Sequence, residues 1–372
     1  MSAKSDASEN RPLRRGWTTG ACATAAARAA FEALATGEAP PDPVEIALPS
    51  GQRVAFALAE FGQENDCATA AVIKDAGDDP DVTHGALVRA HVRRAAPGAG
   101  VIFRAGPGVG TVTRPGLPLP PGEPAINPVP RAMMRTAIAE AATKLGVAPD
   151  AEIEISIPGG EEMAKHTLNG RLGIVGGLSI LGTTGIVTPF SCAAWIDSIH
   201  RGVDVARAIG LDHIAATTGS TSEAAVQRLY GLPETALIEM GDFVGGLIKY
   251  LRSHPVARVT IGGGFAKMTK LAQGRLDLHS ARSTLDLAAL AQTARDTGAD
   301  EALVARIAAA NSALDAFETA HAAGLDLATP VAHGAWRTAA RALNDPAAEL
   351  EIIVFDRTGG LLARAPFRKA VV

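Results

Sequence analysis

Cysteine and aromatic residues are scarce in this sequence. Its 372 residues include three cysteines, and aromatic side chains make up 4% of the chain. Cys22, Cys67 and Cys192 lie far apart and form no CxxC pair, so we expect neither a disulfide framework nor a structural zinc site. The nine histidines show no HxxxH or HExxH spacing, and we therefore expect no protein-bound catalytic metal.

Strong net charge and long apolar runs are also missing. The formal net charge is −4, and no run approaches the roughly 18 apolar residues of a membrane span. A nucleic-acid footprint or a membrane-binding patch is therefore not indicated. The first residues, "MSAKSDASENRPLRR", lack the apolar core of a secretory signal. We expect a soluble, cytoplasmic protein.

Motifs for nucleophilic catalysis are absent as well. The sequence has no GxSxG elbow and no recognisable cysteine-nucleophile motif. The stretch "GGGFAKMTK" misses the phosphate-binding P-loop pattern because Ala266, and not glycine, precedes Lys267. The sequence therefore indicates no catalytic nucleophile supplied by the protein.

Glycine, by contrast, is abundant, and the pattern around it suggests two domains, as the length does. Residues 1–15 read as a disordered polar tail. Residues 16–160 mix short strands with helices expected near 18–34 and 131–145, which predicts an α+β domain. The Pro- and Gly-rich segment 105–130 is interpreted as a surface loop, with a lid over a site as the alternative.

Residues 161–372 follow a different pattern. Apolar strands alternate with helices, which predicts an α/β domain with a mainly parallel sheet flanked by helices. The expected strands end in small residues at "RLGIVGG", "HIAATTG", "ALIEMGD" and "RVTIGGG", and "LEIIVFDR" is expected to be the last strand. In open α/β sheets, ligands bind outside the carboxyl ends of the strands.

Those strand ends predict a binding site for a nucleotide-like ligand. Glycines let the backbone approach a ligand closely, and hydroxyl and carboxylate side chains add hydrogen bonds. Two alternatives remain: glycines that serve only packing, and helix capping by Asp242 or by a capping box of Ser220 and Glu223. The candidate ligand-binding residues are Gly176, Gly177, Thr183, Thr184, Gly185, Thr218, Gly219 and Asp242.

The stretch "GRLDLHSARS" supplies the candidate catalytic residues Asp277 and His279. An unperturbed imidazole titrates near neutrality, so His279 is the best candidate for a general base, with a structural histidine as the alternative. Lys267 and Lys270 are candidate partners for carboxylates, or else part of a solvated helix face. A site rich in donors and poor in nucleophiles suits transfer from an activated reagent, such as methyl transfer from a sulfonium donor.

Several blocks of the sequence resemble the CbiD family of cobalt-precorrin-5B (C-1)-methyltransferases of cobalamin biosynthesis. The blocks occur in the family's order between about residues 16 and 280, and their joint occurrence is highly specific. They are "GWTTGACATAAARAA", "AKHTLNGRLGIVGGLSILGTTGIVTPFS", "TTGSTSE", "GDFVGG" and "IGGGFAKMTKLAQGRLDLHS". The resemblance implies methylation of C-1 of a cobalt-bearing contracted tetrapyrrole by S-adenosylmethionine, giving cobalt-precorrin-6A. It also implies a fold that pairs an α+β domain with an α/β domain.

The resemblance assigns roles to the candidate residues. S-adenosylmethionine would lie across "GGLSILGTTG" and "TTGST", and His279, a neighbouring carboxylate or water would take the released proton. The macrocycle carries acetate and propionate groups, for which Lys267, Lys270 and Arg275 are expected clamps. Thr18 and Thr19 open a helix whose N-terminus could receive another carboxylate, unless they serve only as caps.

Two rival functions and the partners complete the expectations. An ATP-dependent small-molecule kinase would need a better phosphate site, and a non-catalytic tetrapyrrole-binding protein would leave the strand-end turns without a purpose. The expected partner is a corrinoid substrate. The sequence leaves open a homo-oligomer and transient contacts with neighbouring pathway enzymes.

Overall fold

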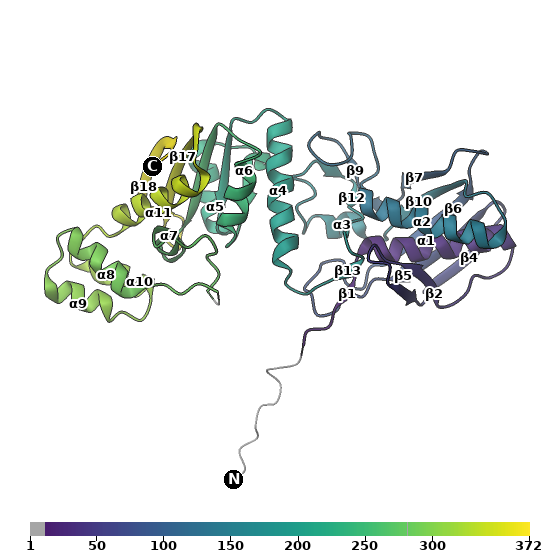
Figure 1. Cartoon of the computed structure of the whole chain (residues 1–372), viewed down its shortest axis with the longest axis horizontal. Helices are drawn as coiled ribbons and strands as arrows, with labels where there is room; N and C mark the ends of the chain where they lie inside the picture. Colours follow the sequence, from purple (N-terminus) through teal and green to yellow (C-terminus); the bar gives the residue numbers. More distant parts are fainter. Residues whose placement is uncertain (1–11, 281) are drawn as a thin grey trace, which may run out of the picture. The chain divides into compact units, whose positions relative to one another are not determined.

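The computed structural model describes residues 12–280 and 282–372, and its backbone divides into two compact units (Figure 1). The first unit ends at Ser191 and the second begins at Cys192. The expected boundary between residues 160 and 161 is therefore too early, and residues 161–191 belong to the first unit. Residues 1–11 of the expected N-terminal tail lie outside the described residues.

Short strand pairs explain the later boundary. Between residues 161 and 191, each two-residue strand pairs with an earlier strand of the first unit. β11 (Ile174–Val175) pairs with β9 (Thr111–Val112), β12 (Gly177–Leu178) with β8 (Gly108–Val109), and β13 (Ile186–Val187) with β1 (Gly16–Trp17). The stretch "RLGIVGG" thus contributes no strand to the sheet of the second unit, contrary to the expectation.

The main sheet of the first unit has five strands and is mostly antiparallel. Its strand order is β4 (Glu60–Glu64), β5 (Cys67–Ile73), β6 (Leu87–Arg94), β10 (Ala151–Ser156) and β7 (Val101–Ala105). Only β10 and β7 pair in parallel among these five. A separate hairpin joins β2 (Val44–Ala47) to β3 (Arg53–Phe56).

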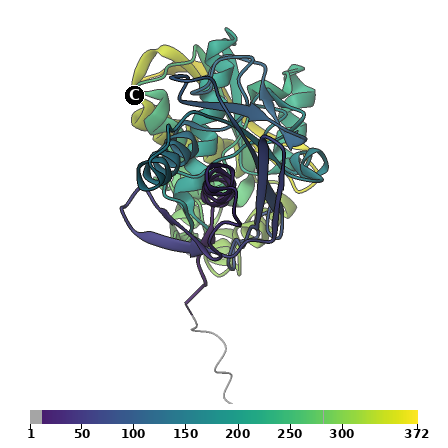
Figure 2. The same ribbon diagram turned by 90° about the vertical axis from the view of Figure 1, so that its right-hand side faces the viewer.

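The alanine-rich helix α1 (Thr19–Thr36) is buried on every side. It packs against β5 and β6 on one side and against α2 (Pro128–Leu145) on the other, and Figure 2 shows both helices end-on beside the strands. The residues from Thr19 to Leu34 are all buried. The sequence pattern predicted this helix but only one apolar face. Small side chains let it fit between two layers, as a helix apolar all round requires.

The second unit is built on a sheet in the order β15 (Leu237–Glu239), β14 (His213–Thr217), β16 (Arg258–Gly264), β17 (Asp345–Phe355) and β18 (Leu361–Ala370). Neighbours among the first four strands are parallel, and β18 is antiparallel to β17. The expectation that the chain ends with the strand at 350–357 is wrong. β18 escapes a sequence reading because Pro366 and several charges interrupt its apolar pattern, as on other edge strands.

Helices cover both faces of this sheet. α5 (Ser220–Tyr230) packs on one face through Ala225 and Val226, against Ala215 and Phe355. The opposite face carries the larger core, to which most of the remaining helices contribute. These are α4 (Cys192–Ala208), α6 (Val244–Leu251), α7 (Phe265–Ala272), α8 (Leu287–Asp296), α9 (Glu301–Ala308), α10 (Ala313–Ala322) and α11 (Ala328–Leu343). Shorter helices are α3 (Gly160–Ala164) in the first unit and η1 (Glu234–Ala236) in the second.

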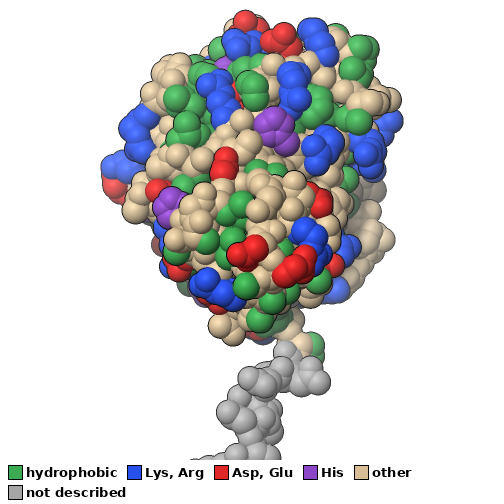
Figure 3. Space-filling model, turned by 90° about the vertical axis from the view of Figure 1, so that its left-hand side faces the viewer, with side chains coloured by type: hydrophobic (Ala, Val, Ile, Leu, Met, Phe, Trp, Pro, Cys, Tyr) green, Lys and Arg blue, Asp and Glu red, His purple; other side chains and the backbone are tan. Residues whose placement is uncertain are grey.

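The described surface mixes both signs of charge. On the face in Figure 3, Lys and Arg side chains alternate with Asp and Glu side chains from the top to the lower part. Three basic side chains, His333 and Arg337 of α11 and Arg368 of β18, form a group that we call the α11 group. Burial lowers the pKa of His333 most, and the charges of Arg368 and Arg337 lower it further. Among the helices within residues 12–280 and 282–372, none has the length and apolarity needed to cross a membrane.

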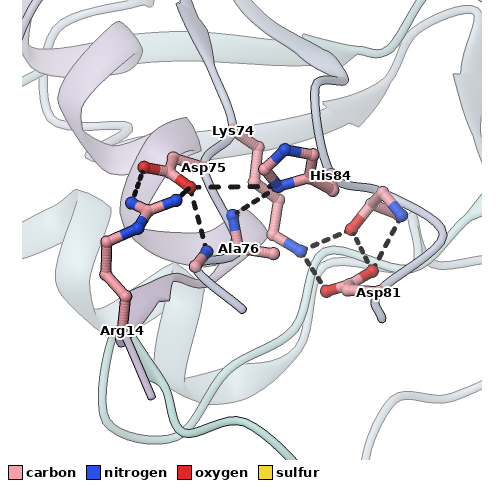
Figure 4. A network of polar contacts seen from close by, with 8 residues as sticks. Arg14, Lys74, Asp75, Ala76, Asp81 and His84 are labelled. Carbon is pink, nitrogen blue, oxygen red and sulfur yellow. Dashed lines mark hydrogen bonds and ion pairs between the residues drawn. The ribbon is translucent and has the colours of Figure 1, made fainter. Parts of the chain in front are cut away.

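A polar loop of residues 74–84 holds both ends of the first unit (Figure 4). The Trp17 amide donates to the Asp75 carbonyl, and the Phe190 amide donates to Asp79. The Arg14 guanidinium pairs with Asp75, and its hydrogen bond lowers the pKa of Asp75 to about 2. Arg14, which belongs to the expected tail of residues 1–15, is thus part of the folded unit, and the expected end of the tail is too late.

Inside this loop, Lys74 is 2% exposed, and its ammonium bonds to Asp81 and Thr83. Burying an ammonium is costly unless it is paired, so this contact fixes the shape of the loop.

Candidate functional site

The order of the strands in the second unit creates a topological switch point at the carboxyl ends of its parallel strands. From β14 the chain passes through α5 to β15 on one side, and then through α6 back to β16 on the other side of β14. The connections that leave β14 and β16 therefore diverge at their carboxyl ends. Such a switch point is where open α/β sheets bind ligands. Thr218 and Gly219 follow β14 at this point, and Gly264 ends β16.

Two glycines at the switch point face open space. A Cβ added at Gly219 or Gly264 would have no heavy atom within 4 Å among the described residues beyond its chain neighbours. Gly219 is the N-cap of α5 and Gly264 is the N-cap of α7, and neither cap has a side-chain hydrogen bond. The expected capping box of Ser220 and Glu223 is therefore wrong as a description of this helix start. Free helix amides favour an anionic group.

Three predicted residues from three different strand ends meet here. Lys267 Nζ lies 2.9 Å from Asp242 Oδ1 and donates to the Thr218 carbonyl at 3.2 Å. The alternative in which Asp242 caps α6 is also wrong, because Phe243 is the N-cap and has no side-chain hydrogen bond. The buried hydroxyl of Thr217, next to Thr218, has no hydrogen-bond partner in the described part of the chain. The carboxyl ends of these strands thus bring together the Asp242 carboxylate, the Lys267 ammonium and the Thr217 hydroxyl, beside glycines that border open space.

The segment with the candidate catalytic residues lies against this edge. The Leu278 amide donates to the Asp242 carbonyl at 2.9 Å. Asp277 accepts from Arg282 Nε at 2.6 Å and from the His279 amide at 3.0 Å. The Arg282 hydrogen bond lowers the pKa of Asp277 most. A carboxylate whose pKa is lowered is a weak base, so this environment favours pairing by Asp277 over proton transfer.

The other predicted cations differ in their availability. Lys270 is buried, and its Nζ donates to the Leu278 carbonyl at 3.0 Å. Its ammonium fixes the segment from within, which contradicts the expectation that it clamps a substrate carboxylate. Arg275 is exposed, and His279 is half-buried.

The glycine-rich stretch 176–185 is not part of this edge, because it belongs to the first unit. A Cβ at Gly177 would come within 2.3 Å of the Gly108 backbone, and one at Gly185 within 2.6 Å of Leu48. The Thr184 hydroxyl bonds to the backbone of Ile186, while Thr183 is exposed. The expectation that Gly176, Gly177, Thr183, Thr184 and Gly185 share one sheet edge with Thr218 is therefore wrong.

Thr18 and Thr19 have a structural setting. Thr18 is the N-cap of α1, and its hydroxyl accepts from the Ala21 amide at 3.2 Å. The Gly20 amide donates to the Leu181 carbonyl, and both threonines are buried. The first turn of α1 is thus largely satisfied by the chain itself, which favours the capping alternative.

Sequence reasoning missed two kinds of residue. Gly264 stands at a strand end like the predicted glycines, and its position before α7 was a usable signal. Trp195, on α4, lies beside the turn after β15, where its Nε1 donates to the Glu239 carbonyl at 3.2 Å. Nothing in the sequence around Trp195 indicates this tertiary contact.

Comparisons with known proteins identify the family. The family model described as CbiD matches residues 6–189, ending close to the boundary between the units, and "CbiD, C-terminal domain" matches residues 277–366. A crystal structure of the cobalamin biosynthesis protein cbiD from Archaeoglobus fulgidus is 29% identical, with a TM-score of 0.39, covering 73% of this chain and 83% of that one.

Curated relatives match almost the whole chain. The protein named cobalt-precorrin-5B C(1)-methyltransferase from Bradyrhizobium sp. is 64% identical over 95% of this chain and 94% of its own. Proteins of the same name from Agrobacterium fabrum and Methylorubrum extorquens are 61% and 60% identical, each over 96% of this chain, and over 94% and 98% of their own. The chain therefore belongs to the CbiD family.

Proposed function

We propose that this chain transfers a methyl group from S-adenosylmethionine to C-1 of cobalt-precorrin-5B, giving cobalt-precorrin-6A. The observation that carries the proposal is the 64% identity, over 95% of the chain, to a relative whose name states the C(1)-methyltransferase activity. Neither rival gains support: "GGGFAK" lacks the P-loop glycine before its lysine, and the names of the matching relatives describe an enzyme.

We further propose that the methyl donor binds at the switch point of the second unit. S-adenosylmethionine, when bound, supplies a methyl group already activated on a sulfonium sulfur. The residues present fit this group: the start of α5 at Gly219 suits its carboxylate, and Asp242 can accept hydrogen bonds from ribose hydroxyls. Open space at Gly219 and Gly264 and the unpartnered Thr217 hydroxyl support the same location.

The chain's own residues then have to position the acceptor and manage a proton. Methylation at C-1 leaves the macrocycle with one proton to lose, and we assign its acceptance to His279, which is next to the edge through Leu278. Asp277 receives the role of a positioning residue because it accepts from the His279 amide and pairs with Arg282. Arg275 is the exposed cation available to a substrate carboxylate.

Calorimetric titration with S-adenosylhomocysteine tests the donor site. We expect saturable binding by the wild-type protein, and a dissociation constant at least tenfold higher for Gly219→Val and for Gly264→Val. Both variants should stay folded, because the added side chains enter open space. Gly176→Ala, in the first unit, is the control and should bind normally. Unchanged affinity in both valine variants would move the donor elsewhere.

An anaerobic assay tests the reaction itself. Wild-type protein with cobalt-precorrin-5B and S-adenosylmethionine should give S-adenosylhomocysteine and a tetrapyrrole in which a methyl group replaces one hydrogen. Mass spectrometry detects the corresponding increase in mass. Turnover of magnesium-ATP in place of methylation would restore the kinase alternative. Binding of the tetrapyrrole without any methylation would restore the carrier alternative.

A further inference from the structure

An exposed tryptophan stands beside the proposed donor site. Trp195 is 43% exposed although it belongs to a unit with a large apolar core. Its indole contacts the turn after β15, which continues directly into Asp242. A large aromatic side chain left open at this place is unusual for a residue that serves only the core, and its neighbours indicate what it could bind.

The indole of Trp195 is held in a fixed position. Its Nε1 donates to the Glu239 carbonyl at 3.2 Å, and Gly241 lies against the ring. A Cβ at Gly241 would be 3.3 Å from the indole, and the φ of +55° there also favours glycine. A rigid ring loses little conformational entropy when a ligand stacks on it, so Trp195 is preorganised for contact.

A second ring, the half-buried Phe243, and a guanidinium lie next to Trp195. The ring centroids of Trp195 and Phe243 are 6.5 Å apart with an interplanar angle of 45°, and the Arg282 guanidinium lies 5.5 Å from the centre of the Phe243 ring. Arg282 also pairs with Asp277 and donates to Cys192 Sγ at 3.4 Å. We call Trp195, Phe243 and Arg282 the aromatic shelf.

The position of the aromatic shelf matches the needs of methyl transfer. The donor carbon and C-1 must approach within about 3–3.5 Å, so the acceptor has to bind next to the donor. The turn Gly241–Asp242–Phe243 belongs to both places, since Asp242 faces Lys267 at the switch point and Phe243 belongs to the shelf. A contracted tetrapyrrole offers a broad conjugated face and peripheral carboxylates, which aromatic rings and arginine recognise.

We propose that the aromatic shelf binds the face of the corrinoid substrate. Trp195 and Phe243 support the macrocycle, and Arg282 exchanges part of its pairing with Asp277 for a peripheral carboxylate of the substrate. This inference rests on the proposed function, because it assigns the acceptor site for the same methyl transfer.

Kinetics with cobalt-precorrin-5B separate the shelf from a merely structural role. For Trp195→Ala we expect the KM for the tetrapyrrole to rise roughly tenfold to a hundredfold, as for other aromatic anchors, with the affinity for S-adenosylhomocysteine unchanged. Trp195→Phe should retain most of the affinity because it keeps a ring. Leu361→Ala, which truncates an exposed apolar residue on β18, is the control and should leave KM unchanged.

Fluorescence supplies a readout that does not depend on turnover. The chain has three tryptophans, of which Trp336 is buried and Trp17 lies in the first unit. Bound cobalt-precorrin-5B should quench the emission of Trp195, so Trp195→Phe should lose most of the quenchable fraction while still binding the tetrapyrrole. Undiminished quenching in this folded variant would overturn the proposal even if Trp195→Ala fails to fold.

Charge variants test the arginine. Arg282→Ala combined with Asp277→Asn removes the pair without leaving a lone carboxylate, and we expect a KM increase that shrinks at high salt. Arg337→Ala removes an exposed cation of the α11 group and is the matched control. Wild-type methylation with a normal KM in both the Trp195 and the Arg282 variants would overturn the shelf alone. A wild-type protein that neither binds nor methylates cobalt-precorrin-5B would overturn the proposed function and the shelf together.

Discussion

Two stretches of the chain look alike in sequence and differ in structure. Residues 176–185 and residues 217–219 both place glycine and threonine after apolar residues, and both resemble ligand-binding turns. In the first stretch a Cβ at Gly182 would come within 2.4 Å of Thr18. In the second a Cβ at Gly219 would enter open space. The same residue type thus stands in close packing in one unit and borders open space in the other.

The surroundings of each stretch decide the difference. β12 pairs with β8, and the loop 74–84 holds both Trp17 and Phe190, so residues 176–190 are tied to earlier parts of the chain. Thr218 and Gly219 instead follow the central strand of a parallel sheet at its switch point. Glycine content alone therefore does not distinguish close packing from open space; the topology around the glycine does.

The largest effect on folding stability should come from adding a side chain at Gly177, in the packed stretch. Gly177→Ala places a Cβ 2.3 Å from the carbonyl carbon of Gly108. The clash is with backbone atoms, so the paired strands would have to move apart to relieve it. We expect the free energy of unfolding to fall by about 3 kcal/mol or more in urea titrations. Gly176→Ala, where φ is +86° but space is open, should cost only about 1–2 kcal/mol. Equal losses in the two variants would mean that Gly177 is not in close packing.

A smaller effect, on ligand binding and not on stability, is expected at the strand ends of the second unit. Asp242→Asn removes the charge that faces Lys267 while keeping the size of the side chain. A partly exposed pair contributes at most about 1 kcal/mol to folding, so the unfolding midpoint should barely move. The dissociation constant for S-adenosylhomocysteine should rise several-fold because the amide accepts hydrogen bonds less strongly than a carboxylate. A stability loss without any change in binding would make Asp242 a structural residue.

The sequence predicted those features that depend on local composition. It placed Thr218, Gly219 and Asp242 after buried strands, because small and polar residues after apolar runs mark strand ends, and their part in ligand binding stays a prediction. It missed the extent of the first unit, since two-residue strands such as β11 carry no periodicity. It missed the shelf position of Trp195, which depends on a contact with the backbone of a different strand end.

Helix starts show the same limit. Ser220 and Asp242 are favourable capping residues by type, yet Gly219 and Phe243 occupy the N-cap positions. The ends of β14 and β15 set the point at which each helix begins, and this tertiary constraint overrides the local preference. The side chains that do not cap are the ones that remain at the proposed ligand edge.

The smallest expected effect is on stability in acid, and it tests how the loop 74–84 holds the ends of the first unit. The hydrogen bond from Arg14 lowers the pKa of Asp75 to about 2, below its value of about 3.9 in an unfolded chain. A lowered pKa contributes stability above pH 3.9 that is lost as the pH falls toward 2. Asp75→Asn should therefore lower the urea midpoint at pH 6 slightly, because both partners are partly exposed, and change it less at pH 3.

The control for this effect is Glu64→Gln, an exposed acid of β4, which should leave the midpoint unchanged at both pH values. S-adenosylhomocysteine binding by Asp75→Asn should equal that of the wild type, because the loop belongs to the first unit and the proposed donor edge to the second. A loss of binding in this folded variant would give the first unit a part in holding the donor. The glycines of residues 176–185 would then need a ligand-binding role in addition to the packing that their contacts describe.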